Sequence, residues 1–119
     1  MGENVVLIKS KTFAIRVVKL YQWMTECRKE FVLVKQLLRS GTSIGANIRE
    51  AHHAQSKREF VAKMNIALKE AAETEYWLEL LHESGYLNKT EFDSIYADCV
   101  ELNRLLVAIV KTTTQNIKK

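Results

Sequence analysis

The 119-residue chain contains no proline, four glycines and two cysteines, and each scarcity narrows the choice of fold. Because proline interrupts helices, its absence permits long helices and argues against a fold rich in loops. The two cysteines, Cys27 and Cys99, lie far apart in the sequence and belong to no CxxC or Cys/His motif. This usage is typical of reduced thiols in a cytoplasmic protein and argues against a disulfide.

Long apolar runs are also missing. Near the N-terminus only Val5–Ile8 is continuously apolar, and no cleavage-site pattern follows it, so no signal peptide is predicted. No stretch approaches the roughly 18 apolar residues that a membrane-spanning helix needs. The length suits one domain with a buried core and is too short for two, so we expect a single domain over residues 1–119 and no association with a membrane.

Acidic residues are scarce in the first part of the chain. Overall, 18 Lys and Arg residues against 14 Asp and Glu residues give a formal charge of +4. Residues 1–50 carry nine cations and four anions (+5), whereas residues 51–119 carry nine and ten (−1), and the two parts sum to +4. An excess of positive charge favours an anionic partner, with nucleic acid as the first candidate.

What the sequence has in abundance is helical periodicity. Apolar residues recur at intervals of three and four and predict four helices, at about residues 11–27, 31–55, 57–84 and 89–116. Ser56 with Glu59 predicts a capping box at the start of the third helix, and Gly85 a left-handed residue after its end. Short connections place successive helices antiparallel, so we predict an all-α, antiparallel up-down four-helix bundle.

The segment RSGTSIGANIRE (39–50) places two of the four glycines inside the second predicted helix. Ile44 and Ile48 continue the apolar period through it, and it lacks the lysine and the preceding strand of a phosphate-binding loop. We therefore predict one helix with at most a kink at residues 40–46, in which Gly41 and Gly45 let a neighbouring backbone approach closely. The alternative is a bend between two shorter helices, because glycine is unfavourable inside a helix.

The first and third predicted helices carry more apolar residues than one buried stripe requires. At about 100° per residue, Ile15 and Val18 fall away from the main stripe of the first helix, and Ile66 and Trp77 widen that of the third. Apolar surplus of this kind is typical of a subunit interface. We therefore expect a homo-oligomer, with these four residues in its interface.

Three blocks of sequence carry a family resemblance: RSGTSIGANIREA (39–51), SKREF (56–60) and IALKEAAETEYWLELL (66–81). In this order they resemble the bacterial four helix bundle protein family, which has been classed with ribosomal proteins and whose founding members are encoded in intervening sequences of 23S ribosomal RNA genes. The resemblance covers about residues 13–106. That family in turn resembles the accessory variability proteins of diversity-generating retroelements, which are basic homopentamers that bind nucleic acid and a reverse transcriptase. The resemblance implies a left-handed up-down bundle, a homopentamer, and nucleic acid or a nucleic-acid-processing protein as partner.

Some polar residues fall where apolar ones are expected. Glu70 and Thr74 lie on the apolar side of the third predicted helix, and Asn47 borders the stripe of the second. A buried carboxylate needs a partner, and the preceding helix offers Arg39, Asn47 and Arg49 as donors. No nucleophile and base accompany these residues, so we interpret them as a structural polar network and predict no catalytic residue.

Two E-x-x-H motifs raise a metal-enzyme alternative. Glu50 with His53 and Glu79 with His82 have the spacing that di-iron carboxylate bundles use. However, Glu50 and His53 point away from the Ile44–Ile48 stripe, so the two motifs should not face each other. We therefore predict no metal, no cofactor, no small-molecule substrate and no enzymatic activity.

Basic residues with neighbouring aromatic residues support a nucleic-acid surface. The candidates are spread over the first three helices: Arg16, Lys19, Lys35, Arg39, Lys57, Arg58 and Lys63. Trp23, which lies on the same side of the first predicted helix as Arg16 and Lys19, is either a stacking residue or part of a subunit contact. Since no sequence-reading motif is present, binding should depend on backbone charge. The predicted function is a basic oligomer that binds nucleic acid or a nucleic-acid-processing protein; the alternative is a scaffold whose only partners are proteins.

Overall fold

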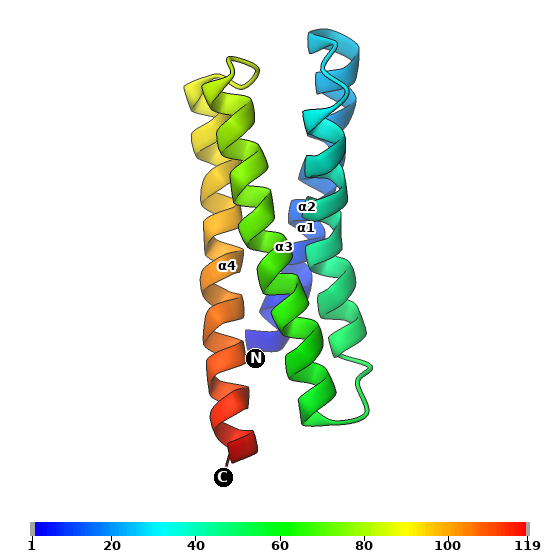
Figure 1. Ribbon diagram of the computed structural model, residues 1–119, viewed down its shortest axis with the longest axis vertical. Coiled ribbons are helices and arrows are strands. Elements are labelled where there is room, and N and C mark those ends of the chain that lie inside the picture. The colour runs from blue at the N-terminus through cyan, green and yellow to red at the C-terminus, as the bar shows by residue number, and fades with distance from the viewer. Residues whose placement is uncertain (1, 119) are drawn as a thin grey trace.

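The computed structural model describes residues 2–118, and all regular secondary structure over that range is helical. In chain order these are α1 (Gly2–Trp23), which continues into a π-helical turn η1 (Met24–Arg28), then α2 (Leu33–Ala51), α3 (Lys57–Glu83) and α4 (Lys89–Lys118). Figure 1 shows that the helices alternate in direction, with the α1–α2 and α3–α4 connections at one end of the bundle and the α2–α3 connection at the other. The predicted all-α four-helix bundle is confirmed.

Each helix packs mainly against its neighbours in the chain, and α1 closes the bundle against α4. The core runs the length of the bundle and is built from the inward positions of all four helices, including Phe13, Leu37, Ile44, Leu78 and Leu102. Within residues 2–118, no helix combines the length and the apolar character that crossing a membrane requires.

The first helix begins at Gly2 instead of residue 11. Val6 is fully buried and lies seven residues before Phe13, so the apolar period already starts in the short Val5–Ile8 run. The second helix is shorter than predicted, from 33 to 51 instead of 31 to 55. The Glu30 carboxylate explains its start, because it accepts hydrogen bonds from the backbone N–H groups of Val32, Leu33 and Val34.

The signals predicted for the two ends of the third helix are confirmed. The Ser56 hydroxyl accepts a hydrogen bond from the backbone N–H of Glu59 at 3.1 Å, and the Glu59 carboxylate accepts one from Gln55. Gly85, which follows α3, has φ +88°, a left-handed value that favours glycine. These local contacts fix where the chain turns back, and therefore which helices become neighbours.

Helix α2 passes through Gly41 and Gly45 without interruption, as predicted. The neighbour that uses the space is α1 of the same chain: a Cβ atom on Gly41 would lie 2.9 Å from a methyl carbon of Val17, and one on Gly45 would lie 3.3 Å from the Ser10 hydroxyl. The hydroxyl groups of Thr42 and Ser43 donate to backbone carbonyls one turn earlier. The segment is therefore a surface for close packing of two helices.

Candidate functional site

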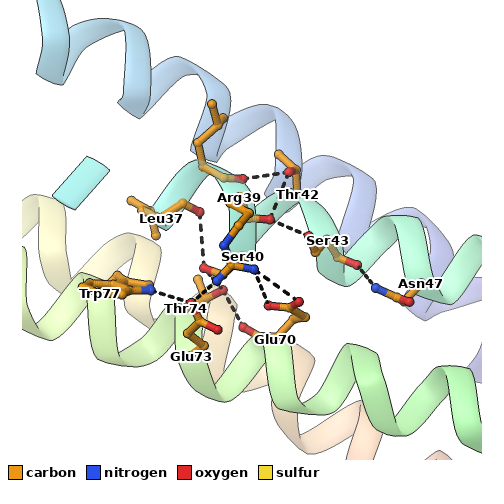
Figure 2. Close-up of polar contacts among 11 residues, drawn as sticks. Leu37, Arg39, Ser40, Thr42, Ser43, Asn47, Glu70, Glu73, Thr74 and Trp77 are labelled. Carbon is orange, nitrogen blue, oxygen red and sulfur yellow. Dashed lines mark hydrogen bonds and ion pairs between the residues drawn. The ribbon is translucent and has the colours of Figure 1, made fainter. Parts of the chain in front are cut away.

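A small polar network lies between α2 and α3 (Figure 2). The hydroxyl groups of Ser40 and Thr74 are 2.9 Å apart, and both residues are fully buried. Thr74 also lies 2.7 Å from the carbonyl oxygen of Glu70, one turn earlier in α3. Two hydroxyl groups that satisfy each other and the helix backbone can sit in an apolar core at little cost, so this pair fixes the register of the two helices.

At the outer edge of this network, Arg39 of α2 pairs with two carboxylates of α3. Its guanidinium lies 3.4 Å from a Glu70 oxygen and donates a hydrogen bond to Glu73. Glu73 also accepts a hydrogen bond from the indole N–H of Trp77 at 2.9 Å. This bond and the pairing with Arg39 lower the pKa of Glu73, and the Glu73 bond raises the pKa of Arg39, so both stay charged.

The sequence predicted part of this network. Glu70 and Thr74 belong to it, with Arg39 as the partner of Glu70, whereas Asn47 lies outside it and donates to the carbonyl oxygen of Ser43 at 2.8 Å. Sequence reasoning missed Ser40, Glu73 and the indole of Trp77. Ser40 could have been found, because it lies three residues after Leu37 and four before Ile44, on the buried face of α2.

The seven cations predicted to bind nucleic acid fall into two groups. Arg16, Arg39 and Lys63 each form an ion pair with a carboxylate of another helix. Arg16 lies 2.7 Å from Asp98 and also donates to Ser94. The other four are exposed and form no ion pair with the residues that the structure describes; they are Lys19, Lys35, Lys57 and Arg58.

These unpaired cations lie at opposite ends of the bundle. Lys19 near the end of α1 and Lys35 near the start of α2 belong to the end with the α1–α2 connection. Lys57 and Arg58 begin α3 and belong to the other end. The structure therefore does not gather the predicted cations into one patch.

Helix α1 carries an apolar stripe on the side that faces away from the core. We call Val5, Ile8, Ile15 and Val18 the α1 outer stripe; they are 41%, 68%, 50% and 38% exposed. Ile15 and Val18 were predicted to be exposed, whereas Val5 and Ile8 were missed because they precede the predicted helix. On α3, Ile66 is exposed and Trp77 is half-buried. These apolar side chains share the outer side of α1 with exposed polar ones, among them Lys11 and Lys19.

The two E-x-x-H motifs lie at opposite ends of the bundle. Glu50, near the end of α2, is exposed and pairs with Lys63 at 2.8 Å. Glu79, near the end of α3, accepts a 2.6 Å hydrogen bond from the Tyr96 hydroxyl, and His82 bonds the Leu87 carbonyl. Across residues 2–118, no three His, Cys, Asp or Glu side chains converge as metal ligands would. Cys27 is exposed and Cys99 buried, and both are unpaired, as predicted.

Taken together, these contacts define a small, basic, single-domain four-helix bundle whose polar groups mainly hold its own helices together. The chain belongs to the 23S rRNA-intervening sequence protein family, whose model matches residues 2–108. The family resemblance seen in the three sequence blocks is therefore confirmed.

A solved structure with the same architecture comes from Bacteroides thetaiotaomicron VPI-5482. It is the crystal structure of a protein of unknown function from the S23 ribosomal protein family, 57% identical in sequence, with a TM-score of 0.92. The alignment covers 93% of the present chain and 99% of the other. No match was found among curated protein sequences. Neither comparison points to an enzyme.

Proposed function

We propose that this protein is a non-enzymatic homo-oligomer that binds nucleic acid, or a nucleic-acid-processing protein, through charge. The observation that carries the proposal is the uneven charge: residues 1–50 hold nine cations against four anions. Between Asn4 and Thr25 there is no acidic residue at all. The two unpaired thiols suit a reducing compartment, so we propose that it acts in the cytoplasm.

Self-association is supported by the α1 outer stripe. Exposed apolar side chains on the solvent face of a helix are disfavoured in water, and burying them against another copy removes that cost. Ile66 on α3 offers a second exposed apolar position. The family resemblance supports a ring of five as the form of the assembly.

Assembly would strengthen weak binding. Five chains of charge +4 carry +20, since 4 × 5 = 20. Each copy would present Lys35, together with Lys19 at the edge of the interface, and neither needs to leave a carboxylate before it contacts a phosphate. Repetition of such weak contacts in one particle raises the overall affinity. Binding should have little sequence preference and should fall steeply with salt, because each neutralised phosphate releases counterions.

The test compares two variants with the same change in charge. Lys19→Glu/Lys35→Glu alters the basic half, and Lys69→Glu/Arg104→Glu alters exposed cations on α3 and α4 that form no ion pair with described residues. Both lower the formal charge of the chain by four, from +4 to 0. We expect the first to weaken binding of fluorescent RNA and DNA much more than the second and to flatten its salt dependence.

Equal losses in the two variants would mean that net charge alone attracts nucleic acid and that α1 and α2 hold no binding surface. If the wild-type oligomer binds neither RNA nor DNA at low salt, the proposal fails. A protein scaffold then replaces it, for which Tyr76, 55% exposed on α3 beside Trp77, is the first candidate contact.

A further inference from the structure

The short connection between α1 and α2 lies at one end of the bundle (Figure 1) and carries two exposed apolar side chains. Phe31 is 57% exposed and Val32 is 71% exposed. Neither is part of the core, and neither belongs to the α1 outer stripe. An aromatic ring exposed to water at the tip of a bundle contributes little to folding and is accessible to a partner.

The connection is held in one conformation. Lys29 has a left-handed backbone with φ +56°. The Glu30 carboxylate accepts three backbone N–H groups at the start of α2, at 3.3, 3.0 and 2.9 Å. Arg28 donates to the carbonyl oxygen of Gly85 at 2.6 Å and so links this connection to the one between α3 and α4. Phe31 is therefore presented by a fixed support, which lowers the entropy lost on binding.

Three exposed cations lie within four residues of Phe31 in the chain. Arg28, Lys29 and Lys35 are all exposed, whereas Glu30 is only 8% exposed and its carboxylate is occupied by backbone N–H groups. The exposed acid on this segment is Glu26. The Arg28 guanidinium also lies 6.0 Å from the ring centroids of both Trp23 and Tyr86. Positive charge beside flat rings is the combination that proteins use to hold single strands.

We infer that this end of the bundle binds unpaired bases of single-stranded RNA or DNA, with the ring of Phe31 stacking on a base and Arg28, Lys29 and Lys35 beside the phosphates. The inference rests on the proposed function and specifies its ligand. A ring on a convex tip can stack on a base only when that face of the base is open, and the bases of a duplex are already stacked on both faces. Single strands should therefore depend on Phe31, and duplexes should not.

The test uses Phe31→Ala with Val32→Ala as the matched control. Val32 is adjacent and more exposed but has no aromatic face. The probes are a fluorescein-labelled oligouridylate and an RNA duplex of equal length, titrated at low salt with the full-length oligomer. Loss of one stacked base should weaken oligouridylate binding by about fivefold to a hundredfold. Val32→Ala should change it less than twofold, duplex binding should be unchanged, and Phe31→Tyr should retain wild-type affinity.

Several results would overturn the inference while leaving the proposed function intact. These are unchanged oligouridylate binding in Phe31→Ala, an equal loss in Val32→Ala, or an equal loss for the duplex. If Phe31→Ala and Val32→Ala instead abolish binding to vesicles of phosphatidylglycerol and leave oligouridylate binding unchanged, the tip contacts lipid and the inference is wrong. A wild-type protein that binds neither RNA probe, and no DNA, refutes the proposed function and the inference together.

Discussion

Replacing Gly41 with alanine tests how closely α1 approaches α2. A Cβ atom there would lie 2.9 Å from Cγ2 and 3.0 Å from Cγ1 of Val17. Both distances are well below normal contact between carbon atoms, which is near 3.5–4.0 Å. Val17 is fully buried, and as a β-branched residue it has few alternative rotamers. The added methyl group must therefore push the two helices apart or strain Val17.

Two opposing effects set the size of the change. Alanine is more favourable than glycine inside a helix by about 1 kcal/mol. Overpacking of a buried contact costs about 1–3 kcal/mol. For Gly41 the clash with a stiff side chain dominates, and we expect the free energy of unfolding to fall by roughly 1 kcal/mol after the helix gain is subtracted.

Gly45 provides the matched control, one turn further along the same helix. A Cβ atom there would lie 3.3 Å from the Ser10 hydroxyl and 3.5 Å from its backbone, contacts that a shift of a few tenths of an ångström relieves. Gly45→Ala should therefore keep most of the helix gain and match or exceed the stability of the wild type. Both variants gain the same helix propensity, so the difference between them isolates the contact with Val17.

Urea unfolding followed by circular dichroism measures this difference, at one protein concentration because the unfolding of an oligomer depends on concentration. Adding Val17→Ala to Gly41→Ala removes the clashing methyl groups, so the double variant should lose less stability than the sum of the single changes. The reasoning is refuted if Gly41→Ala is as stable as Gly45→Ala, because the two helices would then have room at Gly41.

Three further predictions follow from the network and the surfaces. Thr74→Val should lower the free energy of unfolding by about 1 kcal/mol. Adding Ser40→Ala to Thr74→Val should lower it by less than Ser40→Ala does alone, because the hydroxyl that lost its partner is removed; urea titration measures both. Ile8→Glu/Ile15→Glu should reduce the mass found by sedimentation towards the 13.7 kDa of one chain while helicity is kept; an unchanged mass would exclude the α1 outer stripe from the interface. The pKa of Glu73 is lowered in the folded state, so its contribution to the free energy of unfolding is present above the ordinary value of 4.5 and is lost as the pH falls through the folded pKa. Glu73→Gln should therefore flatten the loss of stability in acid, and an unchanged acid profile would contradict this.

The four helices and the two ends of α3 could be predicted because their causes are local. The capping contact of Ser56 with Glu59 spans only three residues. Gly85 adopts a left-handed backbone conformation because glycine has no Cβ atom, a property of the residue itself. Gly41 and Gly45 could be assigned to helix packing because Ile44 and Ile48 keep the apolar period through them. The first turns of α1 were missed because Val5–Ile8 is a continuous apolar run, which shows no period until Val6 is aligned with Phe13.

The polar contacts between helices could be predicted only in part, because they join residues far apart in the chain. Arg16 and Asp98 are separated by 82 positions, and Ser40 and Thr74 by 34. Helical spacing states which face a residue occupies, but the partner across an interface depends on the axial offset between two helices. Arg39 shows the consequence: its place on α2 suited both a nucleic-acid surface and a partner for Glu70, and only the offset of α2 against α3 brings it to Glu70 and Glu73.

The ion pairs also change what the positive charge means for binding. Lys9 and Arg16 hold α1 to Glu101 and Asp98 of α4, so part of the excess on the first helix closes the bundle and is less available to phosphates. The cations left over lie at both ends of the bundle, and Lys35 shares one of these ends with Phe31. Assembly through the α1 outer stripe would cover a long side of the bundle and leave that end open. Self-association and binding of single strands would then use different surfaces of one small protein, which is why variants at Ile8 and at Phe31 should separate the two.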